Sequence, residues 1–181
     1  KRFDRLPKNR KIPLEDFAQL SGATRDTKYD SSVEKIIDIV NRFCTFPKVE
    51  LVKLFHRLLF NFLIGNEDMH LKNYSLIADG KITRLAPAYD FLNTTIALAH
   101  PKEESALPLN GKKRNLTRND LLVYLPLERM ELNQNVVNDT VKRMAQSLPS
   151  WPDWIERSFL PPILRDQYHQ VLRERISRLG F

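Results

Sequence analysis

The sequence GNEDMHLKN at residues 65–73 places four chemically active side chains within six positions, between an apolar helix pattern and a strand pattern. These side chains are Asp68, His70, Lys72 and Asn73. Polar groups that leave water on folding cost free energy unless they find partners. So dense a polar set at the junction of two elements favours a functional site, whereas a loop that merely caps the helix and the hairpin is the structural alternative.

The spacing of these residues indicates phosphoryl transfer. That reaction needs a carboxylate that orients the attacking hydroxyl, and oxygen ligands that hold Mg2+ against the phosphates. Asp68 and Asn73 have the D-x-x-x-x-N spacing of a protein-kinase catalytic loop, in which the Asp is the base and the Asn is a metal ligand. Asp90, followed by Phe91, stands after a short hairpin pattern and resembles the metal-binding Asp of a D-F-G element.

A hairpin over residues 74–85 is expected to bring these sites together. Two short strand patterns flank Asp79-Gly80, a dipeptide suited to a type I′ turn. With these two as the turn residues, Asn73 faces Ala86 across the hairpin. Asp90 then lies a few residues further along, near enough to Asn73 for both side chains to reach one metal ion.

Helical periodicity dominates the rest of the chain. Apolar residues recur every three or four positions in five segments, which are residues 14–20, 33–43, 49–64, 133–148 and 163–179. Pro13 stands at a good first helical position for the shortest of them. The strongest stripe, at residues 49–64, is shorter than the roughly 20 apolar residues that a membrane span needs. We therefore predict a mainly α fold, in which a small β-hairpin carries the catalytic and metal-binding loops.

The composition suits one globular domain, because 42% of the 181 residues are hydrophobic and 28% are charged. The single cysteine, Cys44, excludes an intrachain disulfide and a Cys-rich zinc site, and a buried structural thiol is favoured over a reactive one. The formal charge of +7 permits nucleic acid, phosphorylated ligands or an acidic partner, but basic residues are spread along the chain. Three cations in the turn at residues 110–115 could bind phosphate or an acidic substrate, although solvated charge is favoured.

Six short motifs, each weak alone, occur in this order: RFDR at residues 2–5, PLEDF at 13–17, KY at 28–29, DMHLKN at 68–73, PAYD at 87–90 and LNGK at 109–112. Through their order and separations, the chain resembles the C-terminal part of the HipA family of toxin–antitoxin serine/threonine kinases. The likeness runs through nearly all 181 residues and implies a helical kinase-like C-lobe over residues 1–181. The sequence departs from the family's pattern at Leu14, where Gln is frequent, and at Met69, where many members have Gly.

The resemblance also implies the cofactors and the site roles. ATP and Mg2+ are the expected cofactors. His70 is expected to orient the loop or to contact phosphate, with a purely structural hydrogen-bonding role as the alternative. The roles fall into three groups: catalytic for Asp68, His70 and Lys72, metal-binding for Asn73 and Asp90, and nucleotide-binding for Phe3 at the hinge, Tyr89, His70 and Lys72.

A kinase of this type also needs an amino-terminal lobe, with a loop that covers the phosphates and a lysine that pairs with them. The sequence begins at the hinge motif, so we expect a truncated protein or a separate N-lobe polypeptide, and an isolated chain that is inactive or very weakly active. The resemblance implies a DNA-binding antitoxin as partner, contact with DNA only indirectly, and a translation component such as an aminoacyl-tRNA synthetase as substrate. With no recognisable secretory leader we expect a cytoplasmic protein, and with no apolar stripe long enough for a membrane span we expect no membrane contact. The rival interpretation is a non-catalytic scaffold that binds an antitoxin or nucleic acid.

Overall fold

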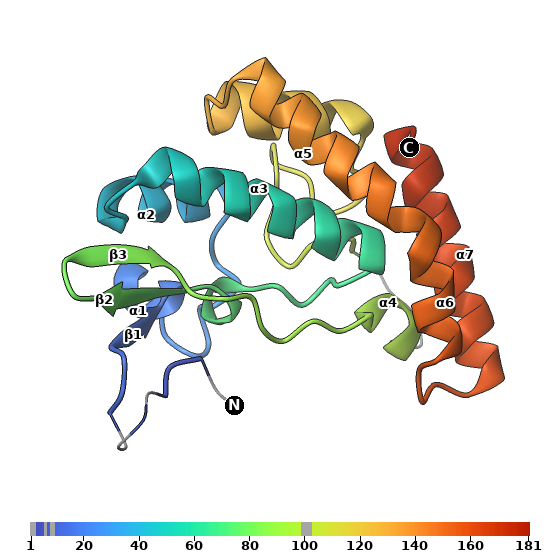
Figure 1. Cartoon of the computed structure of the whole chain (residues 1–181), viewed down its shortest axis with the longest axis horizontal. Coiled ribbons are helices and arrows are strands. Elements are labelled where there is room, and N and C mark those ends of the chain that lie inside the picture. The colour runs from blue at the N-terminus through green and yellow to red at the C-terminus, as the bar shows by residue number, and fades with distance from the viewer. Residues whose placement is uncertain (1–2, 6, 8–9, 99–102) are drawn as a thin grey trace.

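The protein consists of a helical body and a small antiparallel sheet (Figure 1). The computed structural model describes residues 3–5, 7, 10–98 and 103–181. The predicted mainly α fold with a small hairpin is confirmed. The elements follow in the order β1 (Leu14–Asp16), α1 (Phe17–Ser21), α2 (Val33–Phe43), α3 (Pro47–Ile64), 3-10 turn η1 (Leu71–Asn73), β2 (Ser75–Asp79), β3 (Ile82–Leu85), α4 (Thr94–Ala97), π-helical η2 (Asp120–Arg129), α5 (Gln134–Ser147), 3-10 turn η3 (Leu148–Ser150), α6 (Trp151–Glu156) and α7 (Pro162–Leu179).

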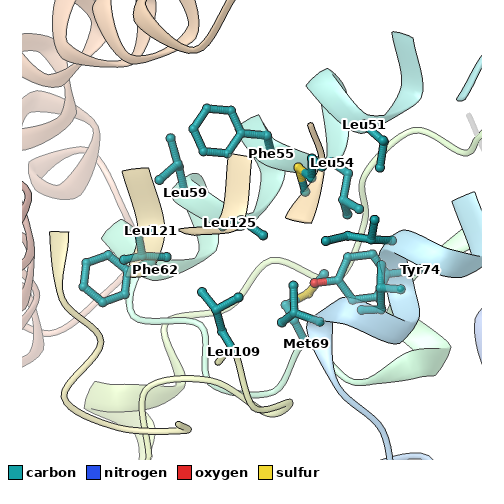
Figure 2. Close-up of a cluster of buried hydrophobic side chains, with 14 of the residues drawn as sticks. Leu51, Leu54, Phe55, Leu59, Phe62, Met69, Tyr74, Leu109, Leu121 and Leu125 are labelled. Carbon is teal, nitrogen blue, oxygen red and sulfur yellow. The ribbon is translucent and has the colours of Figure 1, made fainter. Parts of the chain in front are cut away.

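Helix α3 is the central element of the fold. It contacts α2, α5, α7, η2 and β3, and in Figure 1 it runs between α5 and the sheet. Its side chains Leu54, Leu59 and Phe62 are buried in a core that Leu125 of η2 shares (Figure 2). A fully buried leucine or phenylalanine contributes roughly 1.5–3 kcal/mol. The predicted helix at 49–64 is therefore confirmed, and it begins two residues earlier because proline suits the first helical turn.

Helix α2 has the predicted bounds. The hydroxyl of Ser32 accepts a hydrogen bond from the Lys35 amide at 3.3 Å, which caps the first turn. The helix ends at Phe43, and the side chain of the next residue, Cys44, is buried. Burial raises the pKa of this thiol to about 12, so it stays protonated at neutral pH. The prediction that Cys44 is a buried thiol is confirmed.

The prediction of a helix over residues 14–20 is wrong in its first half. Residues Leu14–Asp16 form strand β1, which pairs with β2 in an antiparallel register. The edge of β2 that faces away from β3 has unpaired backbone N–H and C=O groups, and the three residues of β1 pair with them. Helix α1 begins after Asp16, whose carboxylate accepts from the Gln19 amide at 2.8 Å while the Gln19 side chain accepts from the Asp16 amide.

The hairpin register also differs from the prediction. The turn residues are Gly80 and Lys81, because Asp79 pairs with Ile82 inside the ladder. A type I′ turn needs positive φ at both central residues. Gly80 has φ 63°, but Asp79 keeps a negative φ and stays in the strand. Consequently Ser75, rather than Asn73, faces Ala86, and the Ala86 amide donates to the Ser75 carbonyl at 2.8 Å.

Within the described ranges, no helix combines the length and the apolar character that a membrane crossing requires.

Candidate active site

The candidate loop begins at Gly65, where α3 ends in a left-handed conformation with φ 71°. The hydroxyls of Thr94 and Thr95 in α4 donate to the Gly65 carbonyl at 3.3 and 3.0 Å. A Cβ atom at residue 65 would lie 2.8 Å from Thr95 Oγ1 and 2.9 Å from Asn93 Oδ1. Glycine is therefore required both by the backbone angle and by the close approach of the segment that follows Asp90.

The loop is anchored to the core by alternate residues. Met69 and Leu71 are 5% and 1% exposed, and Met69 lies beside Leu109 and Tyr74 in the core (Figure 2). The methionine that departs from the family's pattern thus fills the core under the loop. Because Asp68 and Lys72 are more exposed than these two anchors, the loop offers their charged groups to solvent or to a ligand.

Asn66 connects the two halves of the site, and sequence reasoning missed it. Its buried amide nitrogen donates to Asn61 Oδ1 at 3.1 Å and to the Asp90 carbonyl at 3.3 Å. Its amide oxygen accepts from the Asp68 backbone N–H at 3.2 Å. One side chain therefore joins helix α3, the predicted base and the predicted metal ligand. The sequence does show an asparagine directly after the glycine that ends the helix, but this pattern is too common to identify a functional residue.

The two predicted metal ligands lie side by side. The amide nitrogen of Asn73 donates to Asp90 Oδ2 at 2.8 Å. Asn73 is buried in η1, whereas Asp90 is exposed and has φ 61°, a left-handed conformation that non-glycine residues seldom adopt. The sequence correctly predicted this proximity, although the hairpin register from which it was argued is wrong.

His70 is held by its neighbours at both ring nitrogens. The Lys28 ammonium lies 2.8 Å from Nε2, and the Lys72 amide lies 3.3 Å from Nδ1. Burial and the Lys28 charge lower the pKa of His70, so its imidazole is neutral near pH 7. Neutral imidazole accepts at one nitrogen alone. Both neighbours are donors: the Lys72 amide donates to Nδ1 at the start of η1, and the Lys28 ammonium lies at Nε2, so the two contacts compete for that single acceptor.

Tyr29 reaches the predicted base from the segment before α2. Its hydroxyl donates to Asp68 Oδ1 at 2.6 Å. Its ring meets the His70 ring edge-on, with the centroids 5.0 Å apart. Residues Lys28 and Tyr29 of the KY motif therefore contact Asp68 and His70 of the catalytic-loop motif. No local sequence pattern indicated that these two motifs meet.

The predicted nucleotide-binding residues also come together. The rings of Phe3 and Tyr89 stack with their centroids 6.0 Å apart and their planes at 24°. The Tyr89 hydroxyl donates to the Lys72 carbonyl at 3.0 Å and is hydrogen-bonded to the Ser75 hydroxyl. The Lys72 ammonium lies 3.8 Å from Asp16 Oδ2 at the end of β1. Three segments distant in sequence thus meet beside the loop.

The basic turn at residues 110–115 is tied into the fold. Lys112 contacts both carboxylate oxygens of Asp120 at 3.0 Å, and Lys113 lies 3.5 Å from Glu103. Burial opposes ionisation of Asp120, but hydrogen bonds from Thr117, Lys112 and Asn110 lower its pKa to about 2. Two of the three cations therefore already have carboxylate partners, as expected for charges that serve the fold.

Oxygen donors for a divalent cation are present, although not as a cluster of carboxylates. In the described part of the chain, no three His, Cys, Asp or Glu side chains gather as a metal site. Mg2+ is commonly held by one or two protein oxygen ligands together with water and substrate phosphates. The Asn73 and Asp90 pair fits that pattern, with Asp68 linked to it through Asn66.

Comparison with known proteins identifies relatives of this arrangement. The family described as the HipA-like C-terminal domain matches residues 1–151. Y4dM of Sinorhizobium fredii, which carries the name of a kinase, is 38% identical over 148 residues, or 81% of this chain and 35% of the relative. A Haemophilus influenzae protein, also named as a kinase, is 29% identical over an alignment of 207 positions, which covers 99% of this chain and 59% of the relative. The chain thus spans less than two thirds of the length of each of these curated relatives.

Solved structures share the fold. HipA of Shewanella oneidensis, determined with HipB and operator DNA, has a TM-score of 0.80 at 20% identity, covering 100% of this chain and 48% of that protein. The Helicobacter pylori proinflammatory kinase CtkA has a TM-score of 0.54 at 18% identity, covering 92% of this chain and 68% of that protein. The structural likeness supports the family match over residues 1–151, and the chain therefore belongs to the family of HipA-like C-terminal domains.

Proposed function

We propose that this chain is the C-terminal lobe of an ATP-dependent kinase that phosphorylates serine or threonine hydroxyls of a protein. The observation that carries the proposal is the hydrogen-bonded set of Asp68, Asn66, Asn73 and Asp90, in which a carboxylate base candidate is tied to a pair of oxygen ligands. Phosphoryl transfer is catalysed mainly by positioning and by charge stabilisation, so a rigid arrangement of this kind suits it.

Asp68 is assigned the role of orienting the acceptor hydroxyl and accepting its proton. Asn73 and Asp90 are assigned to Mg2+ through the amide oxygen and a carboxylate oxygen, which accept no hydrogen bond from the described residues. When bound, the ion would neutralise charge on the phosphates. The hydrogen bond between Asn73 and Asp90 keeps both side chains oriented before the nucleotide arrives.

The remaining residues are assigned to binding and orientation. Phe3 and Tyr89 offer a stacked aromatic pair for the nucleotide. His70 is assigned an orienting role, since Lys28 and the Lys72 amide lie at its two ring nitrogens. The Lys72 ammonium is half exposed and close to the same loop, where it can approach phosphate.

The rest of the protein and its partners belong to the same proposal. The curated relatives are longer than this chain, and we expect their additional sequence to supply the lobe that covers the phosphates. The Shewanella oneidensis relative assembles with HipB and operator DNA, which supports a DNA-binding antitoxin as the partner here. A component of translation in the cytoplasm is the proposed substrate class.

The test is transfer of labelled γ-phosphate from Mg-ATP by the full-length protein, with Asp68→Ala as the comparison. Loss of all but a small residual rate of transfer in Asp68→Ala, with nucleotide binding retained, would support the kinase. Absence of transfer from both proteins to a panel of translation proteins, together with salt-dependent DNA binding and no nucleotide binding, would favour the scaffold.

A further inference from the structure

Tyr29 makes the shortest side-chain contact to Asp68 in the described part of the chain. It lies in the segment between α1 and α2, and its hydroxyl donates to Asp68 Oδ1 at 2.6 Å. A hydrogen bond to an ionised carboxylate is shorter and stronger than a neutral one. Burial, the hydrogen bond and the Asp68 charge raise the pKa of Tyr29 to about 12, so the hydroxyl keeps its proton and acts as the donor.

The position of this hydroxyl is fixed by the loop itself. The Tyr29 ring packs edge-on against His70, and the Lys28 ammonium lies 4.9 Å from the centroid of the Tyr29 ring. The same ammonium contacts His70 Nε2, and the Leu71 amide donates to the Lys28 carbonyl at 3.3 Å. Residues 28 and 29 therefore bind the loop through backbone, ring and charge together.

As a consequence, the two carboxylate oxygens of Asp68 differ in their hydrogen-bond partners. Oδ1 is occupied by the tyrosine hydroxyl, whereas Oδ2 accepts no hydrogen bond from the described residues. A carboxylate that rotates freely would present either oxygen, and a base must lie within hydrogen-bond reach of the proton that it takes. A donor at one oxygen holds the plane of the group and leaves the other oxygen for the substrate.

We propose that Tyr29 is a positioning residue for phosphoryl transfer, whose hydroxyl holds Asp68 Oδ1 so that Oδ2 faces the acceptor hydroxyl. This inference rests on the proposed kinase function. Tyr29 acts through Asp68 and contacts neither the nucleotide nor Mg2+ in this assignment. Its loss should therefore slow the chemical step without weakening nucleotide binding.

The test is a double-mutant cycle in the full-length protein, with Tyr29→Phe and Asp68→Ala singly and together. Phenylalanine keeps the ring against His70 and removes the hydroxyl alone. Tyr124→Phe is the matched control, because the Tyr124 hydroxyl also donates to a carboxylate, at 3.1 Å from Glu34 Oε1. Tyr29→Phe is expected to lower kcat about tenfold with KM for Mg-ATP within about twofold, and to have no further effect in the Asp68→Ala protein.

Three results would overturn the inference. One is an unchanged kcat in Tyr29→Phe. A second is an equal loss of kcat when Tyr29→Phe is made in the native protein and in Asp68→Ala, which would mean that the tyrosine does not act through the base. The third is an equal loss in Tyr124→Phe, which would indicate a general effect on stability. Failure of the kinase proposal is distinguishable, because the native protein would then transfer no phosphate while Asp68→Ala made no difference.

Discussion

Replacement of Gly65 by alanine tests whether the start of the candidate loop is held as the structure indicates. Gly65 has φ 71°, and a non-glycine residue in the left-handed region loses roughly 1–2 kcal/mol. The added Cβ would also lie 2.8 Å from Thr95 Oγ1 and 2.9 Å from Asn93 Oδ1, distances that real Cβ contacts do not show. These oxygens cannot simply move, since Thr95 bonds the Gly65 carbonyl and Asn93 caps α4.

The expected destabilisation is therefore the sum of a backbone cost and a packing cost. Forcing extra volume into a packed site costs about 1–3 kcal/mol, so Gly65→Ala should lose about 3.5 kcal/mol in total. Gly22→Ala is a matched control, because Gly22 has the same φ of 71° and a Cβ added there would meet no atom within 4 Å. That variant should lose roughly 1–2 kcal/mol from the backbone alone.

Urea unfolding of the two variants and the native protein measures both costs. The difference between the variants, about 2 kcal/mol, reports the contact between Gly65 and the Asn93–Thr95 segment. Equal destabilisation by the two substitutions would refute the close packing of that segment on the loop. Titration with Mg-nucleotide in the full-length protein would show whether the same displacement weakens the site that Asp68 and Asp90 share.

Three further predictions concern single side chains. Asp90→Ala should weaken Mg-dependent nucleotide binding of the full-length protein at least about tenfold by calorimetry, and unchanged binding would remove Asp90 from the metal site. Asn66→Ala should cost roughly 1–3 kcal/mol in urea unfolding, because it leaves the buried Asn61 amide oxygen and the partly buried Asp68 backbone N–H without their partner, and a loss near zero would contradict the connecting role. The Asp120 pKa of about 2 lies below its ordinary 3.8, so the ionised carboxylate stabilises the fold above about pH 4, and this contribution is lost as the pH falls towards 2. Unfolding measurements at successive pH values should therefore show a smaller loss of stability over that range for Asp120→Asn than for the native protein.

The helices were predictable because their signals are local. The stripe at residues 33–43 and the serine before it define the same helix that the structure has, since one-sided apolar spacing and a capping hydroxyl act within a few residues. Strand β1 was not predictable in this way. Residues Leu14–Asp16 are extended because the edge of β2 lies beside them, and β2 is about 60 residues away in the sequence.

The residues of the candidate site show the same difference between local and distant sequence signals. Asp68, Asn73 and Asp90 could be proposed from spacing, because a short loop and a hairpin connect them, and an error of register in that hairpin did not separate Asn73 from Asp90. Lys28 and Tyr29 gave no such signal, since their partners stand about 40 residues further along the chain.

The difference between residues that the sequence reveals and residues that only the structure reveals has a physical reason. Groups that bind the phosphates and the metal must lie within a few ångströms of one another, and a short loop achieves that with little loss of chain entropy. Groups that hold the loop rigid must come from elsewhere, because a loop cannot fix its own position in the fold. Tyr29 performs this role from the segment before α2, and Asn61 performs it from α3 by bonding Asn66 at the start of the loop. The orientation of Asp68 therefore depends on two contacts, one from Asn66 at its backbone and one from Tyr29 at its carboxylate. If both contacts serve the proposed base, Asn66→Ala and Tyr29→Phe should each reduce kcat for phosphate transfer by the full-length protein. Only Asn66→Ala should also reduce stability substantially, since Tyr29 is partly exposed and keeps its ring packing as phenylalanine.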